Sequence, residues 1–501
     1  MAKAIMIQGT CSNAGKSLFA AALCRVFRED GYRVAPFKSQ NMALNSAVTP
    51  DGLEIGRAQA MQAEAAGIAP DVRMNPILLK PNSDTGSQLV LCGKPVGDYS
   101  AIEYQKKKKE LLSEVLKAYH SLAAEQDIIV IEGAGSPAEI NLRADDIVNM
   151  GLAEAVDAPV VLIGDIDRGG VFAALYGTVK LLSEAEQARI KGLVINKFRG
   201  DIKILEPGLR QIEALTEKPV LGVLPYRHFD LEDEDSLSER LRKTKAEVDA
   251  LLRIAVIRLP RLSNFTDFDP LQAAPEVALS YVSSPAEIGA ADLLILPGSK
   301  STLDDLAWLK AQGFASCIRE FAASGRPVLG ICGGYQMLGE TLRDKESGVE
   351  AAGLKLLPVD TVFYAAKQTI CAAGEIAVSS GFWAALAGQK TEGYEIHMGQ
   401  SCIGKDGENF QRLFAREDSK RQRADGCVAG AVCGSYLHGL FDEVGVTETL
   451  LKALAARKGL SYPHRLKSHR ERQEAGFRLL SQTLREYFDL RELYRIMGVE
   501  R

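Results

Sequence analysis

One cysteine stands in a setting suited to nucleophilic chemistry. Cys332 follows the apolar run 327–331, is followed by Gly333 and Gly334, and precedes residues of helical character. Small neighbours permit the sharp strand-to-helix turn that exposes a nucleophile, and the start of a helix stabilises a thiolate. The backbone N–H groups of Gly333 and of Gly298 are candidates for an oxyanion hole. We therefore predict that Cys332 attacks a carbonyl carbon.

Two histidines near the ends of apolar runs could supply the base that this cysteine needs. His438 ends the run 429–438, and His397 lies near the end of the run 393–398. Open α/β sheets bind their ligands at the carboxyl ends of the strands, which suits either residue. We expect His438 to take the proton of the Cys332 thiol, with His397 as the alternative.

A glycine-rich segment near the N-terminus is suited to binding phosphate. Residues 9–17 read Gly-Thr-Cys-Ser-Asn-Ala-Gly-Lys-Ser, follow an apolar run and precede a helix-like stretch. Backbone N–H groups and the helix dipole can hold phosphate oxygens there, Lys16 can neutralise them, and Ser17 can bind Mg²⁺. The spacing between the outer glycines is one residue longer than usual, and a chance match is the alternative. The predicted nucleotide-binding residues are Thr10, Asn13, Gly15, Lys16, Ser17 and, further along the chain, Asn196.

Acidic residues in the same half of the chain could complete a metal site. Glu132 ends the apolar run 127–132, where its carboxylate could join Ser17 on Mg²⁺, although a capping role is the alternative. Asp145 and Asp146 are adjacent in a loop before an apolar stretch. Their carboxylates could cap the following helix or face metal and substrate.

These residues need a framework of parallel strands, and the chain repeats the pattern that forms one. Short apolar runs alternate with amphipathic stretches, which is typical of a parallel sheet covered by helices on both faces. We expect two doubly wound α/β domains, at residues 1–227 and 251–446, with a charged linker at 228–250 and a helical extension at 447–501. The predicted strands are 3–8, 33–37, 127–132, 159–164, 192–196 and 219–224, then 253–258, 276–281, 292–296, 327–331, 393–398 and 429–438.

Length and composition agree with this division and narrow the classes of partner. The 501 residues, 46% hydrophobic and 25% charged, indicate two or three globular domains. A net charge of −5 argues against a nucleic-acid partner. No apolar run approaches the ~20 residues of a membrane-spanning helix, and the first residues lack the layout of a signal peptide. Nine scattered cysteines without a CxxC motif favour reduced thiols, so we expect a cytoplasmic protein.

Each half of the chain resembles a known class of protein. The segment 9–17 and the Glu-Gly-Ala-Gly that begins at Glu132 resemble the dethiobiotin synthetase branch of P-loop NTPases, which phosphorylate carboxylate-type substrates. Asn196 resembles an element that reads adenine in related ATPases, although it could be only a turn residue. The setting of Cys332 and His438 resembles the flavodoxin-like class I glutamine amidotransferases. That class usually carries a glutamate two residues after the histidine, where this chain has leucine, so the orienting acid stays open and a dyad is the alternative.

Longer strings extend the resemblance over nearly the whole chain. They are similar to those of the glutamine-hydrolysing cobyric acid synthase family. The strings that carry this resemblance are 37–42, 51–59, 75–81, 83–88, 131–142, 165–170, 196–201 and 434–442.

The resemblance implies a ligase of cobalamin biosynthesis that uses ATP and Mg²⁺. It implies that ammonia, released from L-glutamine at Cys332 with His438 as base, amidates the b, d, e and g carboxylates of adenosylcobyrinic acid a,c-diamide to give adenosylcobyric acid. It makes Asp146 a candidate for the synthetase chemistry. It also makes three charged residues candidates for contact with the corrin periphery or with phosphates, namely Lys80, Asp84 and Arg168. The alternative is that these three residues are solvated loop charges.

Two other functions fit part of the same pattern. One is a glutamine-dependent amidase of another carboxylate, of the cobyrinic acid a,c-diamide synthase type or a cell-wall amidating ligase. The other is a regulatory or partitioning P-loop ATPase with an inert amidotransferase module. An inert module has no reason to keep Cys332 and His438 together, and it would hydrolyse ATP without consuming glutamine.

Overall fold

The chain divides into two compact units that are not continuous in sequence. The structure, a computed structural model, describes residues 2–82, 85–231, 250–415 and 418–500. The first unit comprises Met1–Ala43, Glu54–Glu234 and Arg472–Arg501, and the second comprises Leu44–Leu53 and Asp235–Glu471. Most of the predicted linker, residues 232–249, lies outside the described residues. No described helix is both long enough and apolar enough to cross a lipid bilayer.

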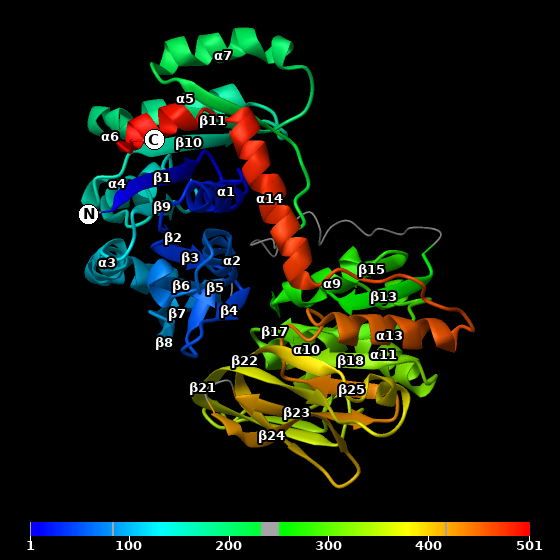
Figure 1. The fold of residues 1–501 in the computed structure, drawn as a ribbon. Coiled ribbons are helices and arrows are strands. Elements are labelled where there is room, and N and C mark those ends of the chain that lie inside the picture. The colour runs from blue at the N-terminus through cyan, green and yellow to red at the C-terminus, as the bar shows by residue number, and fades with distance from the viewer. Residues whose placement is uncertain (1, 83–84, 232–249, 416–417, 501) are drawn as a thin grey trace. The chain divides into compact units, whose positions relative to one another are not determined.

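A six-stranded parallel sheet forms the core of the first unit (Figure 1). Its strands are short apolar runs, and several are buried along their whole length, as a sheet covered on both faces requires. All five neighbouring pairs are parallel, which confirms the α/β fold expected for this half of the chain. The order across the sheet is β12 (Val220–Pro225), β11 (Ile190–Phe198), β10 (Val160–Asp165), β1 (Lys3–Gly9), β9 (Ile128–Glu132) and β2 (Val34–Phe37).

A small second sheet in the first unit was not predicted. It joins β3 (Gln40–Met42), β6 (Ile77–Pro81), β7 (Gly86–Leu91) and β8 (Lys94–Ser100), and only β3 and β6 are parallel. The described α-helices in the N-terminal part of the unit are α1 (Lys16–Glu29), α2 (Arg57–Ala66), α3 (Ala101–Ala123), α4 (Met150–Ala155), α5 (Val171–Leu181), α6 (Glu184–Arg189) and α7 (Ile202–Thr216), and the short strand β5 is Glu54–Gly56.

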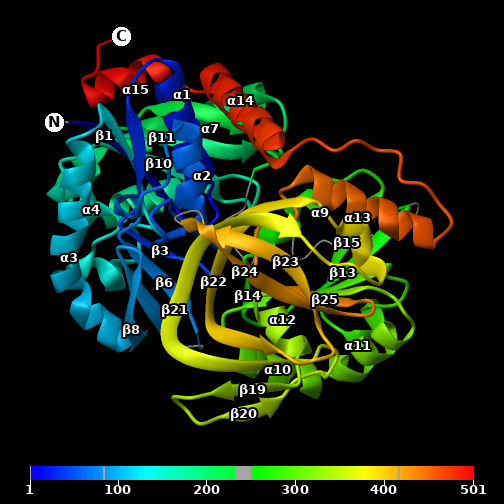
Figure 2. The ribbon, with the colours of Figure 1, turned by 60° about the horizontal axis from the view of Figure 1, so that its bottom comes forward.

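The second unit combines a parallel core with a large antiparallel extension (Figure 2). Five strands are parallel, as expected: β15 (Val277–Val282), β13 (Leu252–Ile257), β16 (Leu293–Leu296), β18 (Val328–Ile331) and β25 (Val432–Ser435). The sheet continues through β24 (Asp418–Ala429), β23 (Glu408–Ala415), β21 (Val359–Ile376), β22 (Lys390–Ile403), β19 (Thr341–Asp344) and β20 (Glu350–Ala352).

The placement of the run 393–398 in a parallel sheet was wrong. It lies within β22, which pairs antiparallel with β21. In β22 buried and exposed positions partly alternate, as in an antiparallel sheet, whereas β18 is buried throughout. Among the residues that the structure describes, the α-helices of the unit are α9 (Asp269–Ala273), α10 (Thr302–Ala311), α11 (Phe314–Ala323), α12 (Gly333–Leu338) and α13 (Val444–Arg457).

The C-terminal helices divide between the two units. Helix α13 belongs to the second unit, whereas α14 (His469–Tyr487) from Arg472 onward and α15 (Leu490–Met497) belong to the first. The ring of Phe488 packs edge-on against Phe19, with the ring centroids 5.3 Å apart, and Tyr494 packs in the same way against Phe27. Both partners lie on α1, the helix that begins at the glycine-rich segment.

Candidate functional site

Cys332 occupies the turn between β18 and α12. Its backbone angles, φ 51° and ψ −106°, are ones that residues other than glycine rarely adopt. Its N–H donates to the carbonyl of Ser435 in β25 at 2.8 Å, which fixes the turn against the neighbouring strand. The thiol contacts the carbonyl oxygen of Ile396 at 3.6 Å. This strained strand-to-helix turn is the geometry of a nucleophile elbow.

The glycines beside Cys332 are required by lack of space. A Cβ atom on Gly330 would lie 2.6 Å from the backbone nitrogen of Tyr335. One on Gly334 would lie 1.9 Å from the carbonyl oxygen of Leu296. Neither position can accept a side chain without moving the backbone, so the elbow depends on both glycines.

The two predicted oxyanion-hole residues lie close to the nucleophile and the base. A Cβ atom on Gly333 would lie 2.8 Å from the backbone nitrogen of Ser299, and one on Gly298 would lie 3.2 Å from Cε1 of His438. Gly298 is held there because β17 (Gly298–Ser299) pairs with β14 (Leu262–Ser263). The two backbones therefore meet beside Cys332, and their role as hydrogen-bond donors to an oxyanion stays a prediction.

His438 connects Cys332 to a carboxylate that the sequence did not reveal. The ring of His438 lies close enough to Cys332 for the sulfur to affect the charge of the ring. On its other side the ring donates from Nδ1 to Oδ2 of Asp267 at 2.7 Å, and Oδ1 of Asp267 accepts from the N–H of Gly439 at 3.1 Å. Asp267 and His438 are both buried. The three side chains form a Cys-His-Asp triad, in which Asp267 fixes the ring orientation and places the proton on Nδ1.

The surroundings of His438 favour its charged form. Burial opposes a charge on the ring, but the Asp267 carboxylate and the Cys332 sulfur outweigh burial and raise the pKa of His438 to about 10. The ring of Tyr394 stacks on the imidazole, with the ring centroids 5.3 Å apart. A ring held between an acid and a thiol can accept the thiol proton and keep it while the thiolate attacks.

Asp267 was missed because nothing in the sequence links it to His438. It lies 171 residues earlier in the chain, in the short helical turn Phe265–Phe268 that follows β14. The expected place for the acid is two residues after the histidine, where position 440 is Leu. The sequence feature that could have revealed Asp267 is its place after an apolar strand, β13, which lies in the same sheet as β18.

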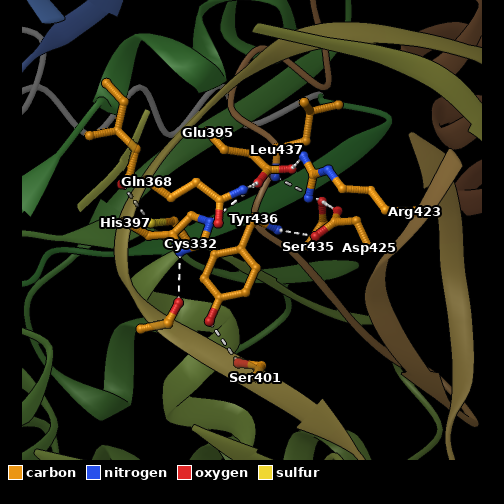
Figure 3. Close-up of polar contacts among 12 residues, drawn as sticks. Cys332, Gln368, Glu395, His397, Ser401, Arg423, Asp425, Ser435, Tyr436 and Leu437 are labelled. Carbon is orange, nitrogen blue, oxygen red and sulfur yellow. Dashed lines mark hydrogen bonds and ion pairs between the residues drawn. The ribbon is translucent and has the colours of Figure 1, made fainter. Parts of the chain in front are cut away.

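The alternative base, His397, is held in a cluster of polar contacts close to Cys332 (Figure 3). Its Nδ1 contacts the carbonyl of Gly399 at 2.7 Å, and its Nε2 contacts Glu395 at 3.2 Å. Its ring stacks on Tyr436, with the centroids 3.8 Å apart, and Glu395 also pairs with Arg423. Both ring nitrogens of His397 are thus engaged within this cluster, and the geometry favours His438 as the base.

In the first unit the glycine-rich segment joins β1 to α1 as a phosphate-binding loop does. The N–H of Thr10 donates to the carbonyl of Ile163 in β10 at 3.0 Å. Asn13 and Gly15 both have positive φ, 61° and 99°, which shape the loop. The ammonium group of Lys16 donates to the carbonyls of Cys11 at 2.9 Å and Gly135 at 3.1 Å. Lys16 therefore lies across the mouth of the loop, where it can reach phosphate oxygens.

Asn196 lies beside the same loop. Its side-chain amide donates to the carbonyl of Ala14 at 2.9 Å. The following residue, Lys197, donates to the carbonyl of Asn13 at 2.7 Å and pairs with Asp165 at 2.8 Å. The structure thus brings the end of β11 to the loop, and adenine recognition by Asn196 stays a prediction.

The predicted Mg²⁺ ligands, Ser17 and Glu132, are in direct contact. The Ser17 hydroxyl donates to Oε1 of Glu132 at 2.7 Å, and the same oxygen accepts from Lys38 at 2.9 Å. The other oxygen of Glu132 accepts from Gln62 at 2.7 Å. A hydroxyl and a buried carboxylate side by side fit a Mg²⁺ ion that takes its other ligands from phosphates and water.

Asp146 makes the contacts of a helix cap. One oxygen accepts from the N–H groups of Val148 at 2.8 Å and Asn149 at 2.9 Å, and the other accepts from Gly151 at 3.1 Å. These donors lie just before and at the start of α4. The contacts of Asp146 that the structure describes are therefore those of a residue that caps the helix. Its part in the synthetase chemistry stays a prediction.

The three tentative substrate residues have different surroundings. Lys80 is buried in β6, where it pairs with Glu54 at 2.6 Å, so it is not a solvated loop charge. Arg168 is 63% exposed, and its guanidinium lies 3.8 Å from Asp165. Asp84 lies outside the described residues. Lys80 and Arg168 are thus cations that each face an acid, which a substrate carboxylate could replace.

Comparisons with known proteins match a family to each half of the chain. Residues 5–236 match a CobQ/CobB/MinD/ParA nucleotide binding domain, and residues 253–446 match a CobB/CobQ-like glutamine amidotransferase domain. The chain is 53% identical to the cobyric acid synthase of Ruminiclostridium cellulolyticum, with 100% of this chain and 98% of that protein aligned. It is 51% identical to that of Photorhabdus laumondii (100% and 99% aligned) and 52% identical to that of Yersinia enterocolitica (98% of each). A nucleotide-binding unit and a Cys-His-Asp amidotransferase unit in one chain, with relatives aligned end to end, show that this protein belongs to the cobyric acid synthase family.

Proposed function

We propose that the chain uses ATP and glutamine to amidate the b, d, e and g carboxylates of adenosylcobyrinic acid a,c-diamide, giving adenosylcobyric acid. The observation that carries this proposal is the triad, in which Asp267 orients His438 beside Cys332. A triad of this kind releases ammonia, and a phosphate-binding loop in the same chain supplies the means to use it. The names of the relatives support the corrin substrate.

The amidotransferase reaction follows from the order of these side chains. The S–H bond of Cys332 breaks and its proton passes to Nε2 of His438. The sulfur attacks the side-chain carbonyl carbon of glutamine, and the N–H groups beside Gly298 and Gly333 are placed to stabilise the oxyanion. His438 returns the proton to the leaving nitrogen, which departs as ammonia. Water, deprotonated by His438, then releases glutamate from the thioester.

The loop of the first unit is suited to activating a carboxylate. ATP supplies the phosphoryl group that turns the substrate carboxylate into an acyl phosphate, which ammonia can displace. Lys16 would bind the transferred phosphoryl group, and Ser17 with Glu132 would hold Mg²⁺. Lys38 pairs with Glu132 at 2.9 Å, so this carboxylate already faces a cation in the structure.

Two cations of the first unit support an anionic substrate. The whole chain has a net charge of −5, so a polycarboxylate must be met by local cations. Lys80 and Arg168 are two such cations, and each faces an acid in the structure. We propose that substrate carboxylates take the place of these acids. The cytoplasmic location also stays a prediction.

The experiment that tests the proposal counts amide groups. Purified protein is incubated with adenosylcobyrinic acid a,c-diamide, glutamine, ATP and Mg²⁺, and the corrin is analysed by mass spectrometry. The expected result is four successive mass decreases of about one unit, each the exchange of a carboxyl OH for NH₂. An unchanged corrin, or steady ATP hydrolysis without glutamate release, would contradict the proposal.

A further inference from the structure

Ten residues from the first half of the chain belong to the second unit. Leu44–Leu53 groups with the amidotransferase residues, although β3 before it and β5 after it belong to the first unit. Ser46–Val48, strand β4, is fully buried. We call Leu44–Leu53 the inserted segment, and its contacts lead directly to His438.

The inserted segment holds the residue that touches the base. The N–H of Ser46 donates to Oδ1 of Asn264 at 3.0 Å, and Nδ2 of Asn264 lies 3.2 Å from Nε2 of His438. Beside it, Oδ1 of Asn45 accepts from the N–H of Phe265 at 3.3 Å. All these residues are buried. Two consecutive residues of the inserted segment therefore fix the position of Asn264.

The hydrogen bonds determine which way the Asn264 amide points. A backbone N–H can only donate, so the oxygen of Asn264 must face Ser46 and its NH₂ group must face His438. An NH₂ group needs an acceptor, and the only one that Nε2 can offer is the lone pair of an unprotonated ring nitrogen. The proton of the neutral ring is then on Nδ1, where Asp267 accepts it.

This arrangement opposes the first step of catalysis. Nε2 must take the proton of Cys332, and once protonated it would direct an N–H at the NH₂ group of Asn264. Two donors facing each other in a buried site are unfavourable. Asp267 and Cys332 draw a proton onto the ring, whereas Asn264 favours the ring without it. His438 thus lies between opposing partners, and a shift of Asn264 away from the ring would leave Asp267 and Cys332 less opposed.

Two further features bear on what a movement of the inserted segment would do. Nδ2 of Asn45 is buried and, among the described residues, has no hydrogen-bond partner, which makes the present position costly. Val48 packs in one apolar cluster with Tyr394 and Ile396, and Tyr394 is the ring that stacks on His438. A movement of the inserted segment would therefore reach His438 through Asn264 and through Tyr394.

We propose that Asn264 is a positioning residue that restrains glutamine hydrolysis, and that the inserted segment sets whether this restraint is in place. The inference rests on the proposed function. The inserted segment is joined at both ends to the first unit, and Glu54, the residue after it, pairs with Lys80. A substrate carboxylate that displaced Glu54 from Lys80 would act on the chain next to the inserted segment. Release of Asn264 would then leave Nε2 free to accept the Cys332 proton.

The test replaces Asn264 by glycine. Asn264→Gly removes the amide and tolerates the backbone angle of φ 52° that Asn264 adopts. Glutamate release is measured with glutamine alone and again with ATP, Mg²⁺ and adenosylcobyrinic acid a,c-diamide. We expect the rate with glutamine alone to rise about tenfold through kcat, with KM for glutamine unchanged, as the loss of one opposing hydrogen bond would give. The ratio of the rate with ATP, Mg²⁺ and corrin to the rate with glutamine alone should fall towards one.

The matched control is Glu276→Gly, a second change to glycine at positive φ in the same unit. Glu276 has φ 56° and pairs with His464. This variant should keep the wild-type rates. A merely structural role for Asn264 would lower both rates in Asn264→Gly, and that result would overturn the inference, as would an unchanged rate with glutamine alone. A wild-type chain that releases no glutamate under either condition would instead overturn the proposed function, and the inference with it.

Discussion

At the residue scale, the chemistry of the second unit depends on one sulfur atom. Cys332→Ser should abolish glutamine-dependent amidation, because a serine hydroxyl in this site is a far weaker nucleophile than the thiolate. Amidation with added ammonium should persist, since the synthetase residues lie in the first unit. Amide formation from each nitrogen source is the measurement. Cys402→Ser, at an exposed cysteine, serves as the control. Loss of both activities in folded Cys332→Ser protein would refute the division of labour.

Asp267→Asn tests the triad directly. An amide in place of the carboxylate can leave the ring in the wrong tautomer and cannot stabilise its charge. We expect kcat for glutamine hydrolysis to fall about a thousandfold while KM changes little. Ammonium-dependent amidation should be retained. Asp304→Asn, at an exposed acid of α10, is the control, and equal effects of the two changes would contradict the role of Asp267.

The ion pair of His438 and Asp267 predicts how the stability of the folded chain depends on pH. In the folded chain the pKa of His438 is raised from 6.5 to about 10, so the pair contributes stability that is fully present below pH 6.5 and is lost as the pH rises through 10. Comparison of the free energy of unfolding of wild type and Asp267→Asn should therefore show the largest difference near pH 6. A difference that grows between pH 7 and pH 10 would contradict this assignment.

At the element scale, the loop between β1 and α1 carries the other half of the reaction. Lys16→Ala removes the cation that lies across the loop, so amidation should fall about a hundredfold with either nitrogen source. Glutamine hydrolysis without corrin should be unaffected, because its residues lie in the second unit. Lys117→Ala, on the exposed face of α3, is the control. Unchanged amidation in Lys16→Ala would refute the assignment of the loop.

The parallel strands were predictable, and the reason is physical. Each is a short apolar run buried on both faces, which gives an unbroken signal in the sequence, as in β9 and β18. The antiparallel strands were missed because polar and charged residues interrupt their apolar runs, as in β23. The elbow at Cys332 was visible because its glycines are local in sequence. Asp267 and Asn264 reach His438 only through the tertiary fold, so no local pattern could reveal them.

At the scale of the whole molecule, the last helices are part of the first unit. Leu493 of α15 is fully buried and belongs to the same core cluster as residues of β1 and α1. Leu493→Ala should destabilise the first unit by about 2–5 kcal/mol through the cavity that it leaves. Thermal denaturation with ammonium-dependent amidation as readout is the measurement. Leu479→Ala, at a more exposed position of α14, should have little effect, and equal losses would contradict the assignment of α15 to this core.

The sequence predicted a separate helical extension at 447–501, and the structure divides these residues between the two units. Helical spacing revealed the helices themselves. It could not reveal which core each would cover, because Phe488 and Tyr494 find their partners on α1, more than 400 residues earlier in the chain. A contact across that distance leaves no periodic signal.

The division of the chain also limits how the two units can be separated. The first unit includes Arg472–Arg501, and the second includes Leu44–Leu53, which lies between two stretches of the first. A single cut between Leu231 and Ala250 therefore leaves the N-terminal fragment without Arg472–Arg501 and the C-terminal fragment without Leu44–Leu53. Neither fragment would contain all the residues of its unit, so the two activities cannot be obtained as two simple halves of the chain.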